Sequence, residues 1–154
     1  ATAAKARKEI GAAKLITAAN VFAHIGDVHG VVDGILELLG PKGVFISENH
    51  YLGDLIRTLQ YDTIYHEHLR YYSVGSLNEL FGRHGMEIFH VRRIPTHGGS
   101  IRVYSARKGE RKIEPSVKAF LDEEREPTRL ACRTARCSTN SAAACASRSS
   151  TCMR

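Results

Sequence analysis

The sequence predicts an α/β fold in which three strands run parallel and a fourth, closing strand runs antiparallel to them. Helical and strand-like segments alternate along the chain, and this order is typical of a parallel sheet covered by helices. The last two predicted strands, residues 86–93 and 101–107, are joined by a short connection, which favours an antiparallel pair. A chain of 154 residues is long enough for one domain with its own core.

Capping residues and apolar spacing define each element. In chain order, the predicted helices are residues 3–10, 27–39, 51–59 and 73–84, and the predicted strands are residues 14–19, 44–47, 86–93 and 101–107. Asp27 and Ser73 are side chains that favour helix N-termini, and Gly85 stops the helix that Ser73 begins. The second helix carries an apolar stripe made of Val28, Val31, Val32, Ile35, Leu36 and Leu39. A turn, Gly40-Pro41-Lys42-Gly43, separates that helix from the strand that follows.

Polar residues follow the first two strands. Asn20 comes directly after strand 14–19, and Glu48 directly after strand 44–47. Ligands of open parallel sheets bind at the carboxyl ends of the strands. The sequence therefore predicts a site at Asn20, Glu48 and the loops that follow them.

The formal charge of +6 lies almost entirely in the last part of the chain. Residues 1–127 hold all 16 acidic and 17 of the 22 basic residues, so this part is nearly neutral. That balance does not favour a nucleic-acid partner. The apolar runs are far too short to span a membrane and no signal peptide opens the chain, so we expect a cytoplasmic protein with no membrane partner.

Residues 128–154 differ from the rest in composition. They hold five arginines, no acid and all four cysteines, with almost no large apolar residue. The cysteine spacing matches no paired zinc knuckle. We expect a disordered tail without disulfides, in a reducing compartment, and place the domain boundary at residue 127. A shifted reading frame would account for its composition. At the other end, Ala1 to Arg7 has the character of the middle of a helix, so we expect the chain to be truncated there.

The segment Asp62–Tyr72 is the most informative in the chain. It packs Tyr65, His66, Glu67 and His68 into four consecutive positions. Histidine exchanges protons near neutral pH, and a neighbouring carboxylate tunes it. A solvated polar loop is the alternative, but the flanking tyrosines favour a semi-enclosed pocket.

The sequence offers two candidate metal sites. Gly26-Asp27-Val28-His29-Gly30 resembles the start of the metallophosphoesterases, whose Asp and His hold two metals, and a metal-dependent hydrolase using Asp27 and His29 is the alternative function. The other ligand motifs of those enzymes have no good counterpart here, and a helix cap is favoured for Asp27. A second possible cluster consists of His66, Glu67 and His68 with His24, His50 or His97. Proton transfer is favoured over metal binding for these residues, so no metal is predicted.

The segment His97-Gly98-Gly99-Ser100 joins the last two predicted strands. Paired glycines let a backbone approach a ligand closely, and a serine hydroxyl can bind phosphate. A plain glycine turn is the alternative. The chain has no Gly-x-Gly-x-x-Gly loop.

Four segments together resemble the S-adenosylmethionine-dependent sugar C-methyltransferases. They are residues 19–25, 39–45, 62–68 and 97–104, and the similarity extends from about residue 3 to 120. Tyr65-His66-Glu67-His68 and His97-Gly98-Gly99-Ser100 are the specific motifs. The resemblance implies part of the Rossmann-like sheet of a class I methyltransferase, S-adenosylmethionine as cofactor, and a nucleotide-linked keto-deoxysugar as substrate.

The resemblance also implies roles for individual residues. His68 would remove the proton beside the sugar ketone, Glu67 would orient or charge-stabilise His68, and Tyr65 would donate to the sugar or enolate oxygen. His24 would line the same pocket, Asn20 would lie near the cofactor, and the His97–Ser100 segment would contact the substrate.

The chain also departs from the family pattern. The cysteine-rich zinc module, the first strands and the glycine-rich cofactor loop of the family are missing, and Glu48-Asn49-His50-Tyr51 stands where many members have Glu-Val-Pro-Tyr. We therefore expect the free polypeptide to be inactive as a methyltransferase. A non-catalytic remnant is the third hypothesis.

Overall fold

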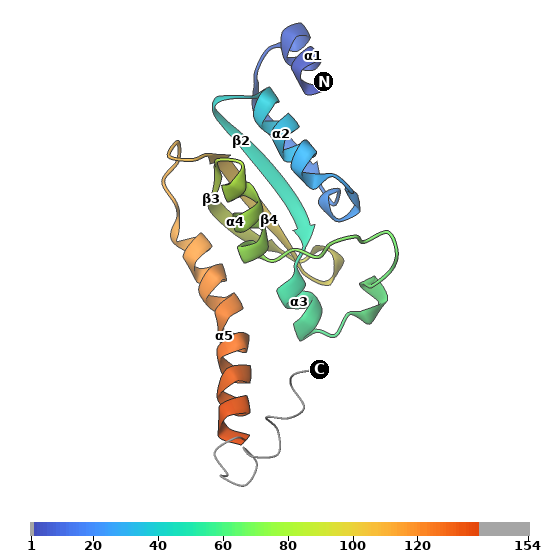
Figure 1. Ribbon diagram of the computed structural model, residues 1–154, viewed down its shortest axis with the longest axis vertical. Helices are drawn as coiled ribbons and strands as arrows, with labels where there is room; N and C mark the ends of the chain where they lie inside the picture. The colour runs from blue at the N-terminus through green and yellow to red at the C-terminus, as the bar shows by residue number, and fades with distance from the viewer. Residues whose placement is uncertain (1, 139–154) are drawn as a thin grey trace, which may run out of the picture. The chain divides into compact units, whose positions relative to one another are not determined.

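The computed structural model describes residues 2–138, with side chains as far as Glu126, and Figure 1 shows the course of the chain. It divides into two compact units, residues 1–121 and 122–154, of which the first holds the sheet and the candidate site. Its elements are α1 (Thr2–Ile10), β1 (Ala13–Ala19), η1 (Phe22–His24), α2 (Val28–Leu38), β2 (Leu39–His50), α3 (Leu52–Arg57), η2 (Tyr61–Thr63), α4 (Val74–Arg83), β3 (Met86–Ile94), η3 (Thr96–Gly98), β4 (Ser100–Arg107) and α5 (Pro115–Ser138).

The four strands form one sheet in the order β1-β2-β4-β3. β1 pairs parallel with β2, whereas β4 pairs antiparallel with both β2 and β3. β1, β2 and β3 therefore share one direction and β4 opposes them, which confirms the predicted strand directions. The sequence did not predict that β4 lies between β2 and β3.

The predicted capping residues lie where the helices begin. The Asp27 carboxylate accepts a hydrogen bond from the backbone N–H of Gly30 at 2.9 Å, and α2 starts at Val28, directly after Asp27. Ser73 and Ser76 form a reciprocal capping box at the start of α4. Gly85, with a φ of +72°, follows the end of that helix.

β2 begins earlier than predicted. The segment Gly40-Pro41-Lys42-Gly43, predicted as a turn, belongs to the strand, and the β1–β2 register shifts between Ala13 and Leu15. Lys42 takes a φ of +56° within this irregular stretch. A bulge of this kind accommodates a bent strand start that a purely local interpretation assigns to a turn.

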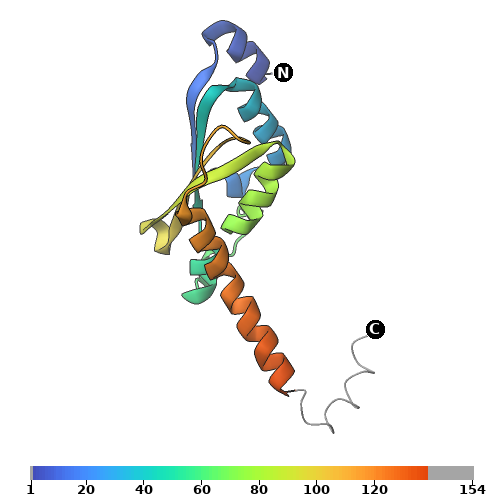
Figure 2. The same ribbon diagram turned by 90° about the vertical axis from the view of Figure 1, so that its left-hand side faces the viewer.

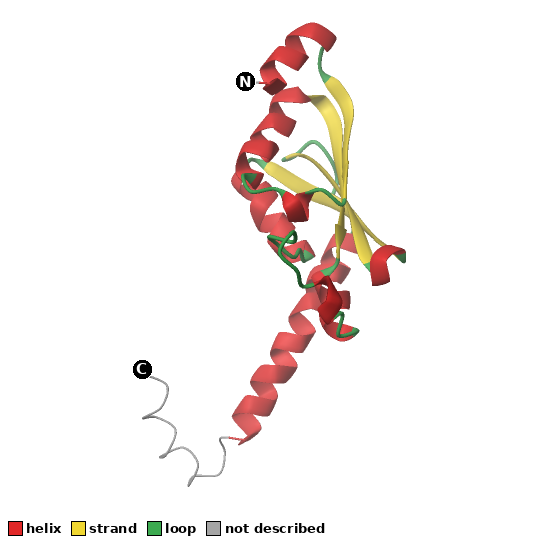
Figure 3. Cartoon of the chain, turned by 90° about the vertical axis from the view of Figure 1, so that its right-hand side faces the viewer, coloured by secondary structure: helices red, strands yellow, loops and turns green. Residues whose placement is uncertain are grey.

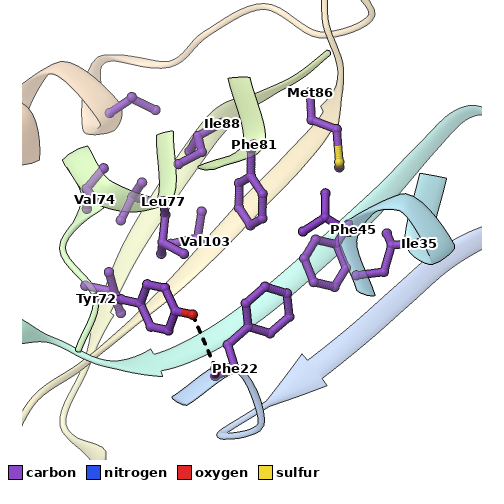
Figure 4. Close-up of a cluster of buried hydrophobic side chains, with 14 of the residues drawn as sticks. Phe22, Ile35, Phe45, Tyr72, Val74, Leu77, Phe81, Met86, Ile88 and Val103 are labelled. Carbon is purple, nitrogen blue, oxygen red and sulfur yellow. Dashed lines mark hydrogen bonds between the residues drawn. The ribbon is translucent and has the colours of Figure 1, made fainter. Parts of the chain in front are cut away.

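Two helices, α2 and α4, pack against one face of the sheet, as the edge-on views in Figures 2 and 3 show. The buried side chains between these layers include Phe22, Ile35, Phe45, Leu77, Phe81, Met86, Ile88 and Val103 (Figure 4). The rings of Phe22, Phe45 and Phe81 lie 5.7–6.3 Å apart, in tilted or edge-on contact. This core fixes η1, which carries His24, against the sheet.

Helix α5 was not predicted. Its first residues belong to the first unit, where Val117 is buried and the Phe120 ring lies edge-on to Tyr51 at 5.7 Å. The helix continues to Ser138, so the boundary expected at residue 127 falls inside it. Alanine, leucine and arginine are good helix formers, which accounts for helix where composition suggested disorder. Residues 139–154 lie outside the described part of the chain.

Candidate active site

A cavity of about 590 Å³ opens at the carboxyl ends of β1 and β2. Its walls come from five parts of the chain: the residue after β1, η1, the end of β2, residues 60–68, and the η3 turn. The lining residues are Asn20, His24, His50, Gln60, Asp62, Thr63, Tyr65, His68, His97 and Gly98. A cavity therefore lies at the carboxyl ends of the strands. Three histidines from separate segments, His24, His50 and His97, line it together with the His-rich loop.

His68 is held in one orientation by its backbone surroundings. Its Nδ1 lies 2.9 Å from the carbonyl oxygen of Thr63, an acceptor, so Nδ1 carries the proton in the neutral ring. Its Nε2 is therefore unprotonated and accepts from the Tyr65 hydroxyl at 3.2 Å. The Tyr71 hydroxyl donates to the same Thr63 carbonyl, also at 3.2 Å. The site thus presents an imidazole lone pair beside a phenolic donor.

His24 has a similar arrangement. Its Nδ1 donates to the backbone carbonyl of Glu67 at 2.9 Å, which leaves its Nε2 as the free acceptor. The His24 and His68 rings lie 5.0 Å apart between centroids. Two imidazoles with the same tautomer therefore line one cavity.

Glu67 enters the site through its backbone. The residue is exposed, and its carbonyl oxygen holds His24. The group on His68 Nδ1 is the Thr63 carbonyl rather than a carboxylate. The predicted role of Glu67 as the group that orients His68 stays a prediction, and Thr63 is an orienting group that the sequence analysis missed.

Asn20 lines the cavity in a left-handed backbone conformation. Its φ is +54°, a region that asparagine tolerates better than most residues, and its N–H donates to the Glu48 carbonyl at 2.9 Å. Asn20 also lines a smaller hollow of about 40 Å³ that it shares with His24, His50 and His68. The Glu48 side chain, by contrast, does not line the cavity and pairs with Arg102 at 2.8 Å.

Only the first half of the His97–Ser100 segment lines the cavity, and the second half packs behind it. His97 and Gly98 line the cavity with φ values of +51° and +74°. Ser100 is fully buried, and its hydroxyl donates to the Thr96 carbonyl at 3.0 Å. Gly99 is packed against the buried Asp54, so close that an added Cβ would lie 2.5 Å from the carboxylate. The structure brings only the first two residues of this motif to the cavity.

The tyrosines around the His-rich segment have different surroundings. Tyr65 and Tyr71 stand beside His68, while Tyr61 is 71% exposed. Tyr72 is buried, and its hydroxyl donates to the Phe22 carbonyl at 3.2 Å (Figure 4). Burial raises the pKa of Tyr72 above its ordinary value, although the positive charge of Arg70 acts in the opposite direction. Tyr72 is thus a core residue that anchors η1.

The residues of the alternative metal hypothesis take part in helix capping and packing. Asp27 caps α2, and His29 Nδ1 lies 2.8 Å from Nε2 of His84, the residue that follows α4. His84 Nδ1 in turn contacts the Asp33 carboxylate at 2.6 Å. Among residues 2–126, whose side chains the structure describes, no three His, Cys, Asp or Glu side chains gather in an arrangement suited to a metal ion. In the same part of the chain, no helix has the length and apolar character needed to cross a membrane.

Three comparisons place the chain among known proteins. The family model described as "Methyltransferase domain" matches residues 2–91. The C-methyltransferase NovU of Streptomyces niveus is 43% identical over 116 residues, which are 75% of this chain and 28% of NovU. The chain therefore spans less than a third of the length of that relative.

Solved structures share the fold at low identity. A SAM-dependent methyltransferase from Anabaena variabilis ATCC 29413 superposes with a TM-score of 0.51 at 17% identity, over 69% of this chain and 54% of that one. LepI, in a structure with SAH and a substrate analogue, gives a TM-score of 0.51 at 10% identity, over 63% of this chain and 27% of that one. These matches agree with the class I methyltransferase fold that the sequence predicts.

Proposed function

Since the chain belongs to the methyltransferase-domain family, we propose that it carries the catalytic residues of an S-adenosylmethionine-dependent C-methyltransferase. The proposed substrate is a nucleotide-linked keto-deoxysugar, methylated at the carbon beside its ketone. Support comes from the 43% identity to a C-methyltransferase and from the motifs Tyr65–His68 and His97–Ser100. The observation that carries the proposal is the pairing of a His68 Nε2 lone pair with the Tyr65 hydroxyl, 3.2 Å apart.

Methylation at such a carbon needs a base and an oxyanion donor together. His68 Nε2 takes the proton from the α-carbon, and the electron pair of the broken C–H bond moves into the ketone, which becomes an enolate. With the substrate carbon beside Nε2, the Tyr65 hydroxyl is released to donate to the enolate oxygen. A general base typically contributes ~10²–10⁴-fold and one oxyanion donor ~10²–10³-fold.

The proton that His68 receives is stabilised at its other ring nitrogen. In the imidazolium, Nδ1–H still donates to the Thr63 carbonyl, so the ring keeps its orientation through the step. The second imidazole, His24, lies 5.0 Å away between centroids and has its own Nε2 acceptor. It is suited to hold a substrate hydroxyl or to pass a proton to solvent.

Asn20 is the residue that we propose to lie beside the cofactor. Asn20 lines the same cavity as His68, so a methyl donor held there would face the enolate carbon. When bound, S-adenosylmethionine supplies the electrophilic methyl group. The Asn20 amide can donate to or accept from such a cofactor without adding charge.

Proton exchange tests the proposal without any methyl donor. The protein is incubated in D₂O with a nucleotide-linked ketosugar, and loss of the α-proton signal is followed by NMR. Exchange is expected with the ketosugar, and none with the matched alcohol, whose C–H bonds are not acidified by a carbonyl. Absence of exchange with every nucleotide-linked ketosugar, in a folded protein, would contradict the proposed function.

A further inference from the structure

The side chain of Gln60 joins two walls of the cavity. Its Oε1 lies 2.9 Å from His50 Nε2 at the end of β2. Its Nε2 donates to the Gly98 carbonyl at 2.9 Å and to the Thr58 hydroxyl at 2.5 Å. The amide thus connects strand β2 with the η3 turn, which are far apart in the sequence.

The orientation of this amide is fixed by its partners. The Gly98 carbonyl is only an acceptor, and the Thr58 hydroxyl already donates to the Asp54 carbonyl at 2.7 Å. Both therefore require the NH₂ end of Gln60, which leaves Oε1 for His50. His50 must then carry a proton on Nε2, whereas His24 and His68 carry theirs on Nδ1.

The glycine at position 98 is explained by the same contact. An added Cβ there would lie 2.7 Å from Gln60 Nε2, and the φ of Gly98 is +74°. The preceding residue, His97, is also left-handed, with a φ of +51°, although it is not a glycine. The Gln60–Gly98 bond therefore holds a strained turn in the conformation that brings His97 to the cavity.

Gln60 also supports the loop that orients His68. Its backbone carbonyl accepts from the Thr63 hydroxyl at 2.8 Å and from the Thr63 N–H at 3.3 Å. The Thr63 carbonyl in turn holds His68 Nδ1. Thr63 therefore links Gln60 to the ring of His68 through hydrogen bonds.

We propose that Gln60 is a positioning residue of this cavity, whose side-chain amide locks the η3 turn and His50 against the loop that carries His68. The inference rests on the proposed function for its catalytic consequence. It also gives His50 a role in contacting the substrate. His50 stands where many members of the family have proline. With Nε2 committed to Gln60, neutral His50 offers Nδ1 as an acceptor suited to a sugar hydroxyl.

The first test measures α-proton exchange and ring-nitrogen states together. In Gln60→Leu, which keeps the size but loses all three side-chain hydrogen bonds, we expect the exchange kcat to fall by about tenfold or more, because small misplacements of reacting groups are costly. The ¹H and ¹⁵N shifts of His50 should lose the signature of a hydrogen-bonded Nε2–H, because Gln60 Oε1 no longer accepts from this group. Gln60→Glu retains the acceptor for His50 but not the donor for Gly98, so it should keep that signature and still lower kcat.

Unchanged kcat and KM in Gln60→Leu, or unchanged His50 shifts, would overturn the inference. If the wild-type protein does not exchange the proton, the proposed function fails, and the His50 shifts then decide the positioning role by themselves. The shifts of Gln60→Glu keep the test informative if Gln60→Leu does not fold.

A double-mutant cycle tests the close approach independently of activity. Gly98→Ala should raise the unfolding equilibrium constant in both backgrounds, and by about tenfold more in the wild type than in Gln60→Ala. Only the full-length glutamine collides with the new methyl group. Gly82→Ala on α4, where nothing lies within 4 Å of the added Cβ, is the matched control and should be additive with Gln60→Ala. Equal effects of Gly98→Ala in both backgrounds would refute the contact.

Discussion

Replacing Phe22 by alanine should remove a large part of the stability of the first unit. The ring is 1% exposed and contacts Phe45, Tyr72 and Phe81 at centroid distances of 5.7, 6.2 and 6.3 Å. Truncating a buried phenylalanine typically costs ~3–5 kcal/mol, and three ring contacts favour the upper half of that range. We expect about 4 kcal/mol, which is roughly a thousandfold in the unfolding equilibrium constant.

Urea unfolding followed by far-UV circular dichroism measures this loss, because the chain has no tryptophan to report by fluorescence. With a urea slope of ~1–2 kcal/mol/M, the midpoint should fall by about 2–4 M at unchanged slope. The control is Ile56→Ala on α3, where the side chain is 61% exposed and the change should stay within ~0.5 kcal/mol. A Phe22→Ala midpoint equal to that of Ile56→Ala would refute the assigned core.

Two further predictions concern Tyr72 and Asp27. Burial raises the pKa of Tyr72, so the folded protein keeps this proton while the unfolded chain loses it above about pH 10; stability from this group is complete below that pH and declines as the pH rises. Tyr72→Phe should lower the free energy of unfolding by about 1 kcal/mol at neutral pH, because the hydrogen bond to the Phe22 carbonyl is lost. The free energy of unfolding of this variant should decline less steeply above pH 10 than that of the wild type. Equal slopes in the two proteins would contradict this prediction. Asp27→Ala should cost about 1 kcal/mol by thermal unfolding and Asp27→Asn far less, since asparagine also caps; equal losses in the two variants would show that the carboxylate has another role.

Local sequence signals predicted most of the elements and the directions of the four strands, but neither helix α5 nor the early start of β2. The caps Asp27 and Ser73, the stop at Gly85 and the short link between the last strands depend on residues close together in the chain. The insertion of β4 between β2 and β3 was not predictable in this way. It depends on side-chain packing between segments far apart in the sequence, such as that of Phe45 against Phe81. The spacing of apolar residues within one element does not reveal such contacts.

The candidate site follows the same division. His68 and Tyr65 lie three residues apart, so one short motif identified both as candidate site residues, and the structure adds the contact between them. The Gln60–Gly98 and His50–Gln60 bonds join ordinary polar residues across the fold, and nothing in their local sequence distinguishes them. The orienting atom on His68 is a backbone carbonyl, which residue types cannot reveal.

The most direct test of the account is deuterium exchange at the substrate α-carbon in the wild type and in His68→Asn. Asparagine retains hydrogen-bonding capacity but cannot accept the proton as a base. The exchange rate should fall by ~10²–10⁴-fold while substrate binding is retained, and Tyr65→Phe should lower it less. A wild-type exchange rate in His68→Asn would contradict the assignment of His68 as the base and point to His24, the second imidazole in the cavity.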